Sequence, residues 1–241
     1  MKTSNPALRP FDTVSIISDD TMTVNGTIWK TAISLAILFA GAFWSWHVIP
    51  TGAASLWMLV GSIGTLILAL ITCFNPKAAP YTTPIYAGLE GLLLGTISSF
   101  FDARYPGIAM QAVTLTGITA FVMLVVFRTG LIRPTEQFRS FLVIAMFSIM
   151  GIYLIDFVLG FFGKGIPLST SNGTFGILFS FFVVGIAALN LILDFGMIDQ
   201  GAKNGAPKYM EWYGAFALMV TLIWLYMEIL RLLSKLQSRR D

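Results

Sequence analysis

Cysteine and charged residues are scarce in this sequence of 241 residues. The one cysteine, Cys73, lies within an apolar stretch, which excludes a disulfide framework and a cysteine-based metal site. Charged residues make up only 11% of the chain and hydrophobic residues 56%, whereas soluble domains have roughly 25% charged residues. The net charge of +3 is scattered along the chain, so nucleic acid is not an expected partner. Composition therefore predicts an integral membrane protein whose main partner is the lipid bilayer.

Seven apolar stretches are long enough to cross about 30 Å of hydrocarbon as helices. Short segments rich in Pro, Gly and Asn separate them, which leaves no room for a catalytic domain outside the membrane. The stretches are residues 28–48, 56–74, 83–101, 109–127, 141–162, 175–198 and 209–233. The sequence thus predicts an all-α integral membrane protein with a polar amino-terminal segment (1–27), a transmembrane domain of seven helices (28–233) and a basic carboxyl-terminal tail (234–241).

Basic residues predict the orientation, because Lys and Arg gather in cytoplasmic loops. We expect a cytoplasmic amino terminus and a location in the cell (inner) membrane. The opening residues lack the pattern of a cleavable signal peptide, so the first span is expected to stay in the protein. Seven crossings place four basic tail residues outside, and a re-entrant last segment with six full crossings is therefore the alternative. The residues expected on the cytoplasmic side are Lys2, Arg9, Lys30, Lys77, Arg128, Arg133, Arg139, Lys203 and Lys208; Arg104 and Lys164 fall on the other side.

Ionisable residues inside the spans are the candidate functional groups. A charged side chain at the centre of a transmembrane helix costs roughly 2.5–3.5 kcal/mol, so each one needs a partner, a water-filled cavity or a neutral form. Glu211, near a span end, is interpreted as a favourable charge at a helix amino terminus. The intramembrane carboxylates are Glu90 in the third span, Asp156 in the fifth, Asp194 in the sixth and Glu228 in the seventh.

Asp194 is the candidate for a pH gate. Asn190 lies one turn earlier on the same helix face, so the two residues form a short polar stripe. Burial disfavours the charged form of a carboxylate, which gives Asp194 a physical basis for responding to pH. The alternative is a structural carboxylate that extends to the nearby interface or pairs with Lys203.

Two other carboxylates have structural interpretations. Glu90 is followed by Gly91 and Gly95, a surface of small residues suited to close helix contact. Glu90 is therefore expected to face a neighbouring helix, where it serves either permeation or an interhelical hydrogen bond. Glu228 and Arg231 are three residues apart near the end of the last span, which predicts a structural ion pair.

The order and spacing of several segments resemble the Bax inhibitor (transmembrane Bax inhibitor motif) family in its prokaryotic branch. These segments are Met-Thr-Val-Asn-Gly-Thr-Ile-Trp-Lys-Thr at 22–31, Leu-Glu-Gly-Leu at 89–92, Leu-Asp at 193–194 and Glu-Ile-Leu-Arg-Leu-Leu at 228–233. The resemblance implies a bundle whose last helix is central, and an activity as a pH-sensitive calcium leak. It also implies that a carboxylate of the sixth helix pairs with one of the seventh to form the gate.

Asp194 falls at the position of the sixth-helix carboxylate, but the seventh-helix position falls at about Thr221. This departure leaves three explanations open. The register is different, or Asp194 pairs with Glu90, Asp156 or Glu211, or the carboxylate pair is absent from this chain. With a single carboxylate, coupled titration is absent and burial alone disfavours the charged form.

Two functions follow from these observations. A calcium leak needs oxygen ligands along a polar path, which Asp194, Asn190, Glu90, Asp156 and Thr221 supply; calcium is then a permeant ion, and no cofactor is expected. The alternative is a regulatory protein that binds a membrane quality-control protease or a stress-response partner. An enzyme is not expected, because neither Asp156 nor Asp194 follows the Gly-x-Gly pattern of intramembrane aspartyl proteases.

Overall fold

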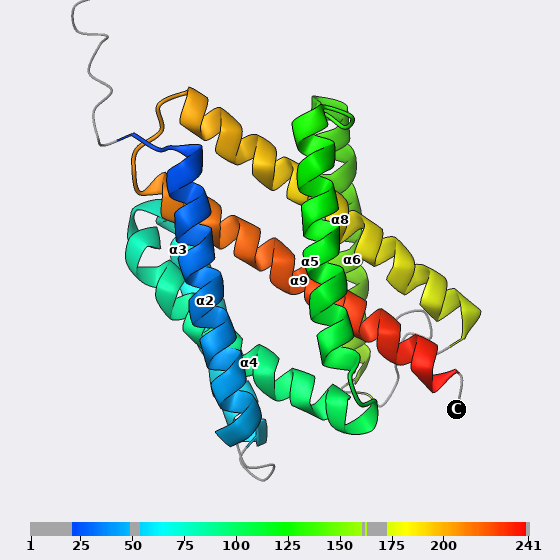
Figure 1. Ribbon diagram of the computed structural model, residues 1–241. Helices are drawn as coiled ribbons and strands as arrows, with labels where there is room; N and C mark the ends of the chain where they lie inside the picture. The colour runs from blue at the N-terminus through cyan, green and yellow to red at the C-terminus, as the bar shows by residue number, and fades with distance from the viewer. Residues whose placement is uncertain (1–20, 49–53, 161, 163–172, 240–241) are drawn as a thin grey trace, which may run out of the picture.

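The chain folds into a bundle of long helices (Figure 1). The computed structural model describes residues 21–48, 54–160, 162 and 173–239. Within these ranges there are seven α-helices, one short 3-10 helix and no β-strand beyond a single bridge between Thr21 and Pro207. The all-α prediction is therefore confirmed for this part of the chain. The elements are α2 (Val24–Val48), α3 (Ala54–Phe74), η2 (Pro76–Ala78), α4 (Ala79–Arg104), α5 (Ile108–Thr129), α6 (Glu136–Gly160), α8 (Thr174–Lys203) and α9 (Met210–Ser238).

Six of these helices are long and apolar enough to cross a membrane, namely α2, α4, α5, α6, α8 and α9. In α3 the apolar stretch is shorter and covers Met58–Phe74. The protein is thus a multi-pass helical membrane protein. The last helix, α9, is unbroken over 29 residues, and it includes residues 234–238 of the predicted tail. Residues 1–20, which form most of the predicted polar segment, lie outside the described residues, as does Lys164.

Proline marks the connection between α3 and α4. Pro76 opens η2 directly after Asn75, and α4 has a proline in its first turn. Both positions suit proline, because the first amide groups of a helix have no partner within the helix. The Asn-Pro punctuation in the sequence thus marks a tight reversal, and α3 and α4 pack against each other.

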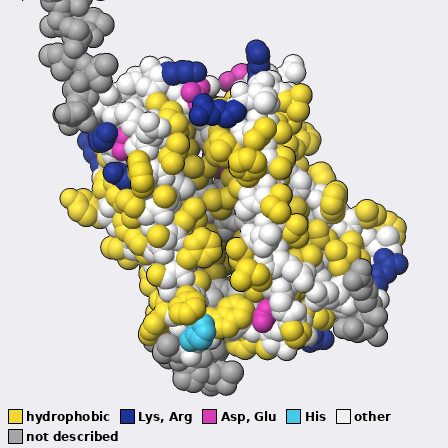
Figure 2. All heavy atoms as spheres, in the orientation of Figure 1, with side chains coloured by type: hydrophobic (Ala, Val, Ile, Leu, Met, Phe, Trp, Pro, Cys, Tyr) yellow, Lys and Arg dark blue, Asp and Glu magenta, His cyan; other side chains and the backbone are white. Residues whose placement is uncertain are grey.

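The helices divide into an interior and an exterior group. Half of the most apolar stretch of α8 and of α9 is buried, and 44% of that of α4, against 11–17% in α2, α5 and α6. The helix α9 packs against α2, α4, α5 and α8. Figure 2 shows that hydrophobic side chains cover most of the visible face, while charged side chains lie toward its two ends. This distribution is the one a bilayer requires, because lipid solvates the apolar sides and water the charged ends.

The contact between α2 and α4 depends on small residues. A Cβ atom at Gly91 would overlap the backbone carbonyl oxygen of Leu38, and one at Gly95 would overlap the Ala42 carbonyl and the Ser45 hydroxyl. The two backbones therefore touch directly, as the small residues after Glu90 predict. Such contact is a common basis of helix association in membranes, where no hydrophobic force drives helices together.

We expect Gly91→Ala to destabilise the bundle by about 1–3 kcal/mol, because the backbone of α2 must shift to admit the methyl group. The free energy of unfolding in mixed detergent micelles measures this loss. Gly117→Ala on α5 is the matched control, since a Cβ there meets no atom within 4 Å, and it should leave stability unchanged or slightly raised. Equal effects of the two variants would contradict the close contact.

Candidate functional site

A polar stripe runs along α9 through Thr221, Glu228 and Lys235. These residues are seven positions apart, and seven residues are close to two helical turns, so their side chains share one face. All three are buried, with exposures of 4%, 2% and 5%. Each of them makes a hydrogen bond to a neighbouring helix. This stripe organises the candidate site.

Thr221 contacts the polar face of α8 near the middle of α9. The side-chain amide of Asn190 donates a hydrogen bond to the Thr221 hydroxyl over 3.2 Å, and the Thr221 hydroxyl also lies beside the Asp194 carboxyl. A threonine hydroxyl can accept one bond and donate another, so the hydroxyl that accepts from Asn190 keeps a proton to offer to the carboxyl beside it, and the three side chains form one polar cluster. Asn190 and Asp194 are each 9% exposed.

Asp194 is incompletely bonded in this arrangement. Its Oδ2 atom is buried and accepts no hydrogen bond from the described residues. Burying an ionised carboxylate without a full set of donors is costly. Ionising Asp194 is therefore unfavourable unless the surrounding structure changes to admit water or another partner.

The register along α9 places Thr221 beside Asp194, at the position where the family resemblance implies a second carboxylate. Two of the other candidate partners, Glu211 and Glu90, make different contacts. Glu211 accepts hydrogen bonds from Thr23 at the start of α2, and Glu90 bonds to Tyr86 on its own helix. In this cluster a hydroxyl and an amide, and not a second carboxylate, face Asp194.

Glu90 lies on α4 in a second polar environment. The Tyr86 hydroxyl donates a long hydrogen bond of 3.5 Å to its Oε1 atom, and the Thr65 hydroxyl of α3 lies nearby. The Oε2 atom is buried and receives no hydrogen bond from the described part of the chain. Glu90 thus faces α3, which agrees with the expectation that it faces a neighbouring helix.

A charged cluster occupies the stripe two turns beyond Thr221. Arg231 Nη1 lies 2.9 Å from Glu228 Oε1, and the Tyr153 hydroxyl of α6 lies 3.0 Å from both carboxylate oxygens of Glu228. Arg231 also donates to the Tyr153 hydroxyl over 2.7 Å and lies above its ring. Glu228 is buried while the Arg231 side chain is 38% exposed. The predicted pair is thus part of a three-residue cluster that joins α6 to α9.

Lys235 is a buried residue that the sequence analysis assigned to the tail. Its ammonium group donates to the Ser180 hydroxyl over 2.9 Å and to the Gly176 carbonyl over 3.2 Å, both on α8. The spacing of seven from Glu228 and fourteen from Thr221 was the signal that could have placed it on the buried face. No comparable spacing in the sequence predicted that Tyr153 of α6 would contact Glu228 and Arg231.

Asp156 is half-buried on α6, one turn after Tyr153. No group of three or more His, Cys, Asp or Glu residues suited to holding a metal ion occurs in the described ranges. The side chains predicted to form an ion path lie in three separate places: Glu90 on α4, Asp156 on α6, and the cluster around Asp194. Of these, the structure brings Asp194, Asn190 and Thr221 together.

The fold and the cluster define a class, that of multi-pass helical membrane proteins with a buried carboxylate between their last two helices. The chain matches the family described as Bax inhibitor 1 like over residues 3–238, essentially its whole length. It therefore belongs to the Bax inhibitor 1 like family. No curated protein matches it.

We expect Tyr153→Phe to lower the free energy of unfolding by about 1–3 kcal/mol, because the buried Glu228 carboxylate loses a donor and Arg231 an acceptor. Unfolding in mixed micelles measures the change. Tyr81→Phe is the control, because this tyrosine of α4 is 78% exposed. The cluster would not contribute to stability if both variants unfolded alike.

Proposed function

We propose that the protein is a pH-sensitive calcium leak of the cell (inner) membrane, gated by Asp194. In this proposal the amino terminus is cytoplasmic, all seven helices cross the membrane and α9 is the central helix. The supporting observation is the buried polar cluster of Asn190, Thr221 and Asp194 between α8 and α9, in which one carboxylate oxygen is left unbonded.

The burial of this cluster corresponds to a closed state, because side chains exposed by less than a tenth leave no hydrated route for an ion. When Asp194 is neutral, the cluster tolerates its dry surroundings. When Asp194 ionises, the charge favours water or a cation beside it. Ionisation therefore favours separation of α8 from α9 and entry of calcium.

Calcium suits the ligands present, because it binds carboxylate, amide and hydroxyl oxygens with flexible geometry. Asp194, Asn190 and Thr221 supply one of each kind. Glu90 and Asp156 are proposed as further residues of the ion path. Conduction requires each site to bind weakly enough to release the ion, which a single carboxylate beside two neutral oxygens satisfies.

The proposal predicts that calcium entry into liposomes containing the purified protein increases from low to high pH over about pH 5 to 8, the range that a buried carboxylate can reach. Asp194→Asn should give low flux that does not depend on pH, because asparagine resembles the neutral carboxyl. A calcium dye inside the liposomes measures the rate.

Asp199→Asn is the matched control on the same helix. Asp199 forms an exposed ion pair with Lys203, with the two groups 2.6 Å apart, and its loss should leave the pH dependence intact. Flux from the unsubstituted protein no greater than from empty liposomes at every pH would exclude the leak. A pH dependence that survives in Asp194→Asn would exclude Asp194 as its origin.

A further inference from the structure

A short segment before α2 is bound to the loop between α8 and α9 (Figure 1). We call residues 21–23 the strap. The Met22 amide donates to the Ala206 carbonyl over 2.7 Å, and Thr21 forms the bridge with Pro207. The strap therefore joins the beginning of α2 to the beginning of α9, although these helices are at opposite ends of the sequence.

Glu211, in the first turn of α9, fastens the strap. Its Oε1 atom accepts hydrogen bonds from the Thr23 amide over 3.0 Å and the Thr23 hydroxyl over 2.9 Å, and it lies 3.1 Å from the Lys208 ammonium group. Glu211 is fully buried. A Cβ atom at Gly26 would overlap its carboxylate, so the start of α2 packs directly on this group.

The contact has the chemistry of a helix cap divided between two segments. Thr23 caps α2 by accepting the Gly26 amide over 2.9 Å. In a capping box, a glutamate three residues after the cap bonds the amide of the cap residue. Gly26 holds that position here, and Glu211 of α9 supplies the carboxylate instead. Its charge also lies at the amino-terminal ends of α2 and α9, where helix dipoles favour an anion.

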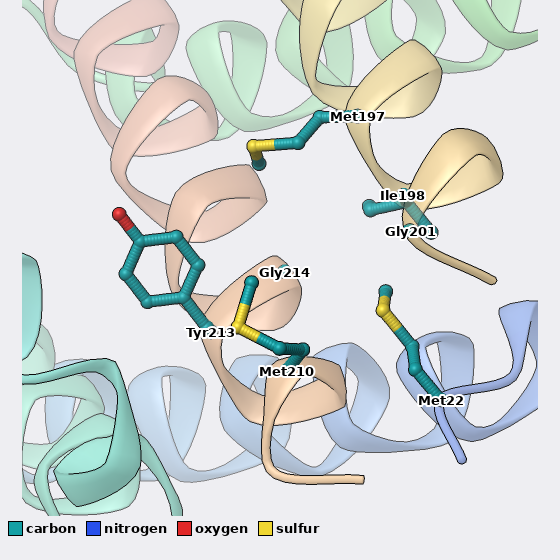
Figure 3. A pocket seen from close by; sticks show the side chains of 7 residues that line it. All are labelled: Met22, Met197, Ile198, Gly201, Met210, Tyr213 and Gly214. Atoms are coloured by element: carbon teal, nitrogen blue, oxygen red, sulfur yellow. The ribbon is translucent and has the colours of Figure 1, made fainter. Parts of the chain in front are cut away.

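Methionine side chains line the space beside the strap. Met22 points into a small cavity whose other walls include Met197 of α8 and Met210 and Tyr213 of α9 (Figure 3). Methionine side chains are flexible and fill irregular space without fixing one geometry. The polar bonds of Glu211 are therefore the specific element that fixes how the strap meets α9.

Thr221 follows Glu211 by ten residues on the same unbroken helix, about 15 Å along its axis. The Thr23–Glu211 bonds and the Asn190–Thr221 bond occur together in one arrangement of α9. Any state in which the beginning of α9 moves away from the strap changes the position of Thr221 relative to α8.

We propose that Glu211 is a positioning residue, which fastens α9 to the strap through Thr23 and so holds Thr221 against Asn190 and Asp194 in the closed state. This inference rests on the proposed function, because the state it stabilises is the closed leak. Glu211 itself contacts no ion in this scheme.

Thr23→Val should raise calcium entry into liposomes at low pH by about tenfold, as expected when a charge-assisted hydrogen bond that favours one of two states is lost. Thr23→Ser keeps the hydroxyl and should retain the low rate of the unsubstituted protein. Asp199→Asn, at the same end of the bundle, should also retain it. Equal rates in Thr23→Val and the unsubstituted protein, or equally raised rates in Thr23→Val and Thr23→Ser, would overturn the proposal.

A disulfide separates positioning from mere structural damage. Paired residues of an antiparallel bridge have Cα atoms about 4.5–5.5 Å apart, which suits a disulfide. Thr21→Cys with Pro207→Cys, combined with Thr23→Val and Cys73→Ser, should therefore give low flux when oxidised and raised flux when reduced. Flux that stays high after oxidation would show that fastening the strap does not close the leak, and would overturn the proposal.

A distance measurement tests the inference without calcium. Spin labels at Phe182→Cys on α8 and Val220→Cys on α9, both exposed positions, in the Cys73→Ser background, should give a broader or longer distance distribution when Thr23→Val is added. That shift in a protein without flux would keep the positioning role and reject the leak. An unchanged distribution would reject the positioning role, whatever the flux.

Discussion

The buried polar side chains of α9 depend on partners from neighbouring segments of the bundle, because the interior of a membrane bundle supplies little water. The rest of the structure depends on this constraint. From its beginning to its end, α9 is hydrogen-bonded in turn to the strap, α4, α8, α4, α6 and α8, and each bond fixes the height and rotation of one neighbour. The bonded pairs are Glu211 with Thr23, the Trp212 carbonyl with Thr83, Thr221 with Asn190, Tyr226 with Ser98, Glu228 with Tyr153, and Lys235 with Ser180.

Hydropathy predicts the helices well because a lipid-exposed helix must be apolar over most of its length. Each predicted span corresponds to one helix of the structure, and only the spans 141–162 and 209–233 extend one or two residues past the ends of α6 and α9. The spacing along α9 also brings Thr221 to Asp194, since register within a helix is rigid. Contacts between distant segments are not visible in this way. The burial of Lys235 depends on where α8 begins, and the bond from Thr23 to Glu211 joins residues 188 positions apart, for which no local pattern exists.

The absence of a second carboxylate at Thr221 changes what controls the buried charge. Two adjacent carboxylates resist being charged together, so their mutual repulsion sets how they titrate. A single Asp194 beside a hydroxyl and an amide has no such repulsion, and its ionisation is governed by how dry the cluster is. Dryness depends on the fit between α8 and α9. The ionisation of Asp194 and the packing of α8 against α9 therefore depend on each other in this chain.

The two ends of α9 differ from its middle in a way that bears on movement. Charged side chains hold both ends to neighbouring segments, Glu211 through its bonds to Thr23 of the strap and Glu228 and Arg231 through their bonds to Tyr153 of α6, whereas neutral hydrogen-bond partners surround Asp194 between them. Sliding α9 along its axis would break the bonds to Thr23 and to Tyr153 at once. Tilting it about the Glu228 cluster would break the contacts of Glu211 and Trp212 first and then those of Thr221. Because the second movement breaks fewer contacts of charged side chains, α9 is expected to move at its beginning, where it contacts the strap.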